Sequence, residues 1–95
     1  MNYDKSPAPI LYIDDEKDNL TVFYSAFRRN FKVHLANSAM EGLEIMKKYT
    51  IHLVIADQRM PEMNGTELLE IVSKKYPDIR RFLLTTFTDL ETVWI

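Results

Sequence analysis

Two kinds of hydrophobic spacing alternate along this chain, and the alternation limits the folds open to it. Short apolar runs typical of strands occur at residues 10–13, 53–56 and 82–84. Residues 31–35 instead alternate between apolar and polar side chains, as in a half-buried strand. The run at 53–56 is the pattern of a strand covered on both faces. We therefore expect four short strands.

Apolar residues spaced three and four apart follow each run and predict four helices. Asp18 or Asn19 is expected to cap the first helix. Capping-box pairs predict the starts of the second helix (Ser38 and Glu41) and of the fourth (Thr88 and Glu91). The inward-facing residues are Leu20, Phe23, Tyr24, Phe27 and Phe31 in the first helix, Ala39, Leu43 and Met46 in the second, Leu68, Leu69 and Val72 in the third, and Leu90, Val93 and Trp94 in the fourth.

Strands that alternate with helices indicate an α/β fold, in which a parallel sheet carries helices on both faces with right-handed crossovers. The 95 residues fit one domain. We expect residues 10–95 to form it, after a disordered lead-in at 1–9. That lead-in lacks the apolar core of a signal peptide, and no apolar stretch approaches the roughly 20 residues of a membrane span.

Charge and cysteine content exclude some classes of function. The net charge is −2, which gives no reason to expect direct nucleic-acid binding by this segment. The chain has no cysteine, so disulfides and thiolate metal sites are excluded. The lack of cysteine is compatible with a reducing cytoplasm.

Three carboxylates stand where predicted strands end: Asp14 and Asp15 after the first strand, and Asp57 after the third. In open parallel sheets, ligands bind outside the carboxyl ends of the strands, at a switch point in strand order. Close carboxyl groups oppose each other's ionisation unless a cation lies among them. The cluster therefore suggests a site for a hard metal ion and for phosphate chemistry.

Each of these residues also has a purely structural interpretation. Asp14 and Asp15 suit the start of a helix, where carboxylates are favourable. Asp57 can begin a turn before Pro61, and Thr85 can be an ordinary strand-end threonine. The residue types alone leave both interpretations open.

Residues 57–65 read D-Q-R-M-P-E-M-N-G. This stretch resembles the phosphoacceptor loop of two-component response-regulator receiver domains (CheY-like), whose pattern is D-x-x-M-P-x-M-D/N-G. The acidic pair Asp14-Asp15 and the hydroxyl residue Thr85 match two further motifs of that family, in the same order. The resemblance covers about residues 10–95. It implies a flavodoxin-like doubly wound sheet with strand order 2-1-3-4, without the family's fifth strand and fifth helix.

The resemblance also implies roles for individual residues. Asp57 would accept a phosphoryl group from a partner histidine kinase or phosphotransfer protein. Mg²⁺ would be bound by Asp15, by Asp57 and by the backbone carbonyl of Arg59, with Asp14 acting largely through a metal-bound water. Thr85 would turn its hydroxyl toward the phosphoryl group. The result would be a cytoplasmic phosphorelay switch, not an enzyme in the ordinary sense, that signals to an output domain or partner.

The chain departs from the family pattern at its C-terminal end. The family's fifth strand ends in a Lys-Pro pair with no counterpart here, since Lys74 and Lys75 fall on the third predicted helix. The fourth strand is thus expected to be a free edge, and the apolar face of the first helix to lose part of its cover. Three explanations are open: further residues in a longer chain, true truncation with a homodimer or strand-exchanged dimer, or a partner chain.

Two other functions are considered beside the phosphorylatable switch. The missing lysine allows a degenerate receiver that binds partners without phosphorylation. A metal-dependent phosphohydrolase with an aspartyl-phosphate intermediate would usually carry a second acid two residues after its nucleophile. That position is Arg59, which argues against turnover.

Overall fold

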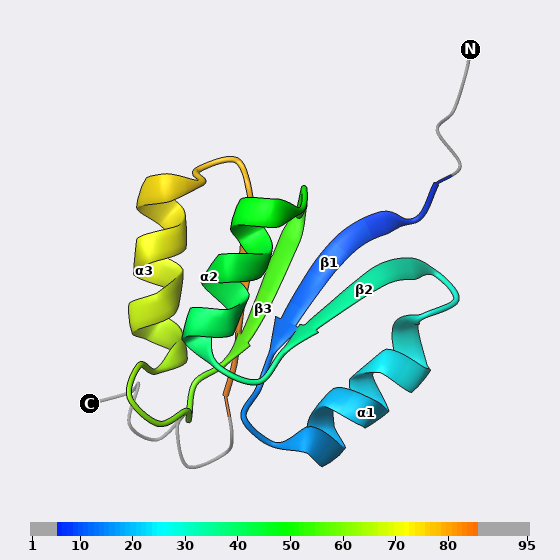
Figure 1. Ribbon diagram of the computed structural model, residues 1–95, viewed down its shortest axis with the longest axis horizontal. Coiled ribbons are helices and arrows are strands. Elements are labelled where there is room, and N and C mark those ends of the chain that lie inside the picture. Colours follow the sequence, from blue (N-terminus) through cyan, green and yellow to red (C-terminus); the bar gives the residue numbers. More distant parts are fainter. Residues whose placement is uncertain (1–5, 86–95) are drawn as a thin grey trace.

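The computed structural model describes residues 6–85. They form one parallel sheet and three helices (Figure 1). The order of the strands across the sheet is β2-β1-β3-β4, which confirms the predicted α/β fold and its strand order. The fourth predicted helix lies outside the described residues. The elements are β1 (Ala8–Ile13), α1 (Lys17–Phe27), β2 (Phe31–Ala36), α2 (Ala39–Lys48), β3 (Leu53–Asp57), α3 (Gly65–Lys75) and β4 (Arg80–Leu84).

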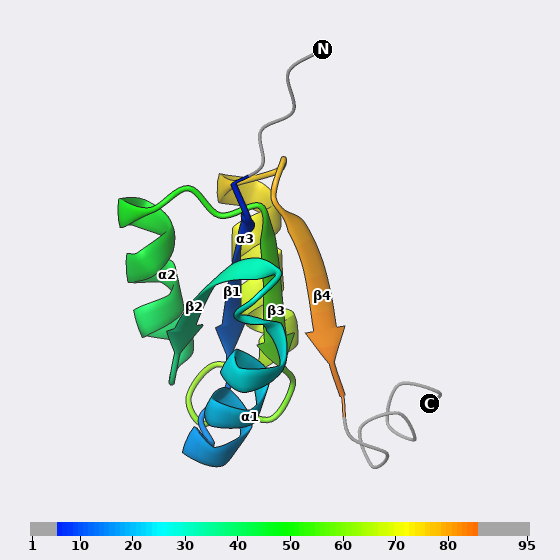
Figure 2. The same cartoon turned by 90° about the vertical axis from the view of Figure 1, so that its right-hand side faces the viewer.

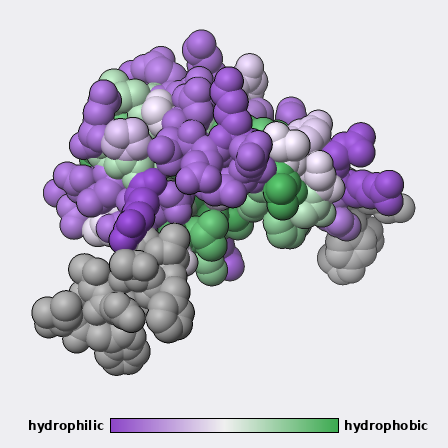
Figure 3. Space-filling view, turned by 90° about the horizontal axis from the view of Figure 1, so that it is seen from below, coloured by the Kyte–Doolittle hydropathy of each residue, from purple (hydrophilic) through white to green (hydrophobic). Residues whose placement is uncertain are grey.

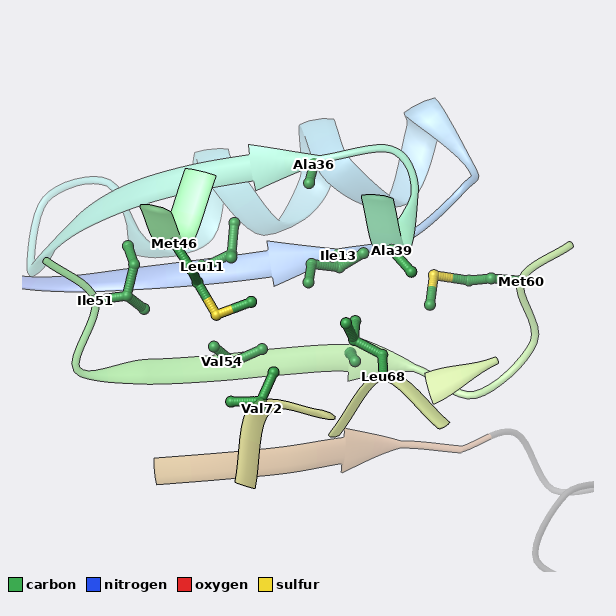
Figure 4. Packing of buried hydrophobic residues seen from close by; sticks show 11 residues of the cluster. Leu11, Ile13, Ala36, Ala39, Met46, Ile51, Val54, Met60, Leu68 and Val72 are labelled. Carbon is green, nitrogen blue, oxygen red and sulfur yellow. The ribbon is translucent and has the colours of Figure 1, made fainter. Parts of the chain in front are cut away.

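Helix α1 lies on one face of the sheet and α2 and α3 lie on the other (Figure 2). Alternate residues of the central strands point toward α2 and α3, where they are fully buried together with residues of these helices (Figure 4). Burial of these side chains supplies most of the hydrophobic free energy that holds the two helices to the sheet. The core cluster comprises Leu11, Ile13, Ala36, Ala39, Met46, Ile51, Val54, Ala56, Met60, Leu68 and Val72.

The face under α1 is held by aromatic rings. Tyr12 stacks on Phe23 with 4.3 Å between ring centroids, and Phe23 contacts Phe27 at 4.7 Å. Phe27 in turn meets Phe31 edge-on at 6.1 Å. Aromatic pairs at these distances stabilise beyond the area they bury, so the row fixes α1 against β1 and β2.

The predicted helix starts are partly corrected. Helix α1 begins at Lys17 after Glu16, without a side-chain cap, so the expected cap at Asp18 or Asn19 is wrong. Ser38 does cap α2 by accepting from the Glu41 N–H at 3.1 Å. The Glu41 carboxylate, however, accepts from the Asn37 N–H and not from that of Ser38.

The strands also extend beyond the predicted runs. β1 begins at Ala8, inside the segment expected to be a lead-in, because parallel pairing with β2 starts there, at Ala8 opposite Phe31. β4 begins at Arg80, whose N–H donates to the carbonyl of His52. Strand pairing sets these ends, whereas hydrophobicity alone showed only the inner residues.

One side of the sheet leaves apolar groups in solvent. β4 pairs only with β3 among the described strands, and Phe82 and Leu84 on it are 59% and 42% exposed. On α1, Val22, Tyr24 and Phe27 are exposed as well. Seen from below, hydrophobic (green) surface appears between mostly hydrophilic (purple) areas (Figure 3). Within residues 6–85, no helix has the length and hydropathy to cross a membrane.

Candidate metal centre

The three predicted carboxylates come together at the switch point of the sheet. β1 and β3 are parallel neighbours with Ile13 opposite Ala56, so Asp14 and Asp57 leave the same edge side by side. One carboxylate oxygen from each of Asp14, Asp15 and Asp57 lies within 4.8 Å of the other two. A set of hard oxygen donors this close suits a Mg²⁺ ion.

Asp14 is the buried member of the cluster, with 1% of its surface exposed. Its Oδ2 accepts from the Tyr12 hydroxyl at 2.5 Å and from the Asn19 side-chain amide at 3.0 Å. Its Oδ1 accepts from the Glu16 backbone N–H at 3.0 Å. These three donors, from a strand, a helix and the turn between them, hold the Asp14 carboxylate in one orientation.

The hydrogen bond to Asp14 also affects the donor, the Tyr12 hydroxyl. Burial raises the pKa of the Tyr12 hydroxyl, and the hydrogen bond to Asp14 and the nearby negative charges raise it further. The hydroxyl therefore stays protonated and donates throughout the physiological pH range. Sequence reasoning missed both Tyr12 and Asn19. Asn19 stands five residues after Asp14 and was assigned to a helix cap, and only the fold brings it to the carboxylate.

Asp15 and Asp57 differ from Asp14 in exposure: Asp15 is exposed and Asp57 is half-buried at the end of β3. Asp14 and Asp57 border an open groove of about 480 Å³ between α1 and β4. Thr85, directly after β4, lines the same groove, so the structure brings the predicted hydroxyl residue to the carboxylates. The other lining residues are Tyr12, Asn19, Val22, Phe23, Ala26, Phe27 and Leu84.

The loop after Asp57 is tied to the start of α3. The side-chain oxygen of Gln58 accepts from both the N–H and the hydroxyl of Thr66, at 2.9 and 2.8 Å. Asn64 and Glu67 form a reciprocal capping box. Its N-x-x-E spacing is readable in the sequence, and it places the start of α3 at the end of the predicted phosphoacceptor loop. Glu62 takes a positive φ of 71° in this loop.

Two further predictions concern the backbone of Arg59 and the placement of the lysines on α3. The backbone carbonyl of Arg59 as a metal ligand remains a prediction. Lys74 and Lys75 lie in the last turn of α3, about 15 Å along the helix axis from its start beside Asp57. The described residues that line the groove include no lysine.

Comparisons with known proteins agree with this geometry. The family model described as "Response regulator receiver domain" matches residues 10–94. A receiver-domain protein of Clostridium thermocellum, solved by crystallography, superposes with a TM-score of 0.83 at 33% identity, covering 90% of this chain and 70% of that one. An uncharacterized protein of Neptuniibacter caesariensis gives a TM-score of 0.88 at 32% identity, covering 96% and 68%.

Curated relatives are longer proteins. The hydrogenase transcriptional regulatory protein HoxA of Cupriavidus necator is 29% identical over 90% of this chain and 18% of its own length. The transcriptional regulatory protein ZraR of Escherichia coli K12 is 32% identical over 87% of this chain and 19% of its own. The chain thus spans about a fifth of these relatives.

Proposed function

The chain belongs to the family of response-regulator receiver domains, and from this we propose that it is a cytoplasmic phosphorelay switch whose phosphoacceptor is Asp57. The proposal is carried by one observation. Asp57 ends β3 within 4.8 Å, oxygen to oxygen, of the two carboxylates that follow β1. Receiver domains are signalling modules, so we expect self-phosphorylation and self-dephosphorylation and no other turnover.

A carboxylate is suited to the phosphoacceptor role because it is ionised at neutral pH and requires no general base. An Asp57 oxygen attacks the phosphorus of a phosphohistidine on the partner kinase or phosphotransfer protein. The phosphorus–nitrogen bond breaks, and its electron pair stays on the imidazole nitrogen. The product is an aspartyl phosphate. Half-buried at the mouth of the groove, Asp57 is accessible to such a donor.

The donor set fits Mg²⁺, which when bound would offset the negative charge of the carboxylates and of the incoming phosphoryl group. We assign Asp15 and Asp57, with the backbone carbonyl of Arg59, to direct metal contacts. Asp14 is buried and already accepts three hydrogen bonds from protein donors. It would therefore act mainly by its charge and through a metal-bound water.

We assign the switch to Thr85, whose position on the groove supports it. Its hydroxyl would turn toward the phosphoryl group on Asp57 and so change the surface near the end of β4. A local charge that biases a two-state element is the common principle of such switches. HoxA and ZraR are named transcriptional regulators. We propose that the present chain likewise signals to an output domain or a partner protein.

Phosphorylation of Asp57 is tested by incubating the chain with Mg²⁺ and acetyl phosphate and measuring its intact mass. We expect one added phosphoryl group, absent from Asp57→Ala and absent without Mg²⁺. Asp78→Ala, in the exposed turn before β4, is the matched control and should be phosphorylated like the parent. Rapid multiple turnover would instead favour a phosphohydrolase, and a folded chain without adduct would favour a degenerate receiver.

A further inference from the structure

We infer that Tyr12 and Asn19 are positioning residues for the metal site: they hold Asp14 in the one orientation in which its charge faces the ion. This inference rests on the proposed function in that the ion is the Mg²⁺ of the receiver site. Neither residue is itself a metal ligand. Both act through Asp14.

The hydrogen bonds to Asp14 leave the carboxylate little freedom. A carboxylate has about four lone-pair directions, and Tyr12, Asn19 and the Glu16 N–H occupy three of them. Two of these donors share Oδ2, so rotation of the carboxylate would break both. The remaining acceptor capacity is on Oδ1, which leaves that oxygen to interact with the ion or its water.

The two donors come from different elements and are themselves held in place. Asn19 and Phe23 are one helical turn apart on α1, so they lie on the same side of the helix. Phe23 stacks on the Tyr12 ring at an interplanar angle of 20°. The stack sets the direction of the Tyr12 hydroxyl, while α1 delivers the Asn19 amide to the same oxygen. The orientation of Asp14 thus depends on how α1 is seated on β1.

The test measures Mg²⁺ binding by titration calorimetry in Tyr12→Phe, which keeps the ring and its stack but removes the donor. Partners of this kind change metal affinity about 10- to 100-fold, and we expect a dissociation constant about tenfold higher. Asn19→Ala should weaken binding in the same direction. Tyr24→Phe, on the exposed side of α1, loses the same hydroxyl without touching Asp14 and should bind Mg²⁺ like the parent chain.

A second readout separates positioning from general structural damage. In Tyr12→Phe the Mg²⁺ concentration that half-saturates phosphorylation by acetyl phosphate should rise, while the rate at saturating Mg²⁺ stays near that of the parent. Parental Mg²⁺ affinity in both Tyr12→Phe and Asn19→Ala would overturn the inference, as would a parent chain that binds no Mg²⁺. If the parent binds Mg²⁺ and Tyr12→Phe weakens it, but no phosphoryl adduct forms, the inference stands and the proposed function fails. If Tyr12→Phe does not fold, the Mg²⁺ affinity of Asn19→Ala alone tests the inference. Asn19 is exposed, so its replacement should disturb the fold less.

Discussion

At Gly65 the start of α3 closely approaches the end of β3 beside the site. It takes no positive φ, so its role is to leave space. A Cβ built there would lie 2.5 Å from the backbone oxygen of Asp57 and 2.7 Å from a methyl of Leu83. A backbone carbonyl cannot rotate away as a side chain can, so a methyl group at this position must displace α3 or the end of β3.

We expect Gly65→Ala to lower the free energy of unfolding by about 1–3 kcal/mol, the usual cost of overpacking. Gly42→Ala is the matched control. Its Cβ would lie 2.5 Å from the terminal methyl of Ile13, which is a side-chain atom that can move. The substitution also favours the helix by up to about 1 kcal/mol. Urea denaturation of both variants provides the comparison. The spatial explanation is wrong if Gly65→Ala is as stable as Gly42→Ala.

The pKa of His34 is lowered in the folded state, which links stability to pH near neutrality. Burial lowers its pKa, and the positive charge of Lys32 lowers it further. The folded state thus disfavours the imidazolium form, while the unfolded chain protonates at about pH 6.5. The contribution of His34 to stability is present above that pH and is lost as the pH falls below it.

The free energy of unfolding of the parent should fall as the pH is lowered from about 7.5 to 5.5. We expect a smaller fall in His34→Gln. The effect should be modest, because His34 is only half-buried against the ring of Tyr49. His52→Gln makes the same substitution at the exposed second histidine and provides the comparison. Equal slopes in the parent and in His34→Gln would contradict the assignment.

Of the three described helices, α3 has the most side-chain hydrogen bonds at its start. Asn64 Oδ1 accepts from the Glu67 N–H at 2.9 Å, and the Glu67 carboxylate accepts from the Asn64 N–H at 3.0 Å. Gln58 adds a bond to the Thr66 N–H. Helix α1, in contrast, begins at Lys17, and the side chain of the preceding Glu16 forms no cap. Within residues 6–85, the helix with the most side-chain bonds at its start is thus the one that follows the Asp57 loop.

We expect Asn64→Ala to cost about 1 kcal/mol of stability, within the range for lost N-caps. Glu16→Ala should cost nothing measurable, since its side chain makes no cap bond. Chemical denaturation in the absence of Mg²⁺ isolates this effect from the metal site. If both variants lose equal stability, the capping box does not anchor α3.

The sequence was sufficient for those features that depend on residue spacing. The order of the elements, the inward residues of α2 and α3, and the meeting of Asp14, Asp15 and Asp57 all follow from periodicity and parallel topology. The bonds from Tyr12 and Asn19 to Asp14 and from Gln58 to Thr66 were not foreseen. They depend on side-chain directions after the turns have formed, and each polar residue had a plausible local role that competed with the tertiary one.

At the scale of the whole molecule, the two sheet faces are unequal. The face toward α2 and α3 encloses the buried core. On the opposite face, the surface between α1 and β4 exposes Phe82, Leu84 and Val22 beside the groove of the site. An exposed edge strand with apolar side chains is a ready template for association. Among the described residues, the carboxylate cluster and this exposed apolar surface therefore lie side by side.

We expect a chain of these 95 residues to self-associate, with a mean mass in sedimentation velocity that rises with concentration. Phe82→Lys places a charge on the edge strand and should shift the distribution toward monomer. Met40→Lys makes the same change at a residue of α2 that is 60% exposed, away from β4, and should leave association unchanged. A single monomeric species at every concentration, with cooperative unfolding, would contradict this prediction. It would show that the apolar surface between α1 and β4 can stay exposed to solvent without causing association. If Phe82→Lys shifts the distribution toward monomer as expected and still binds Mg²⁺ like the parent, then self-association and metal binding use adjacent but separate surfaces.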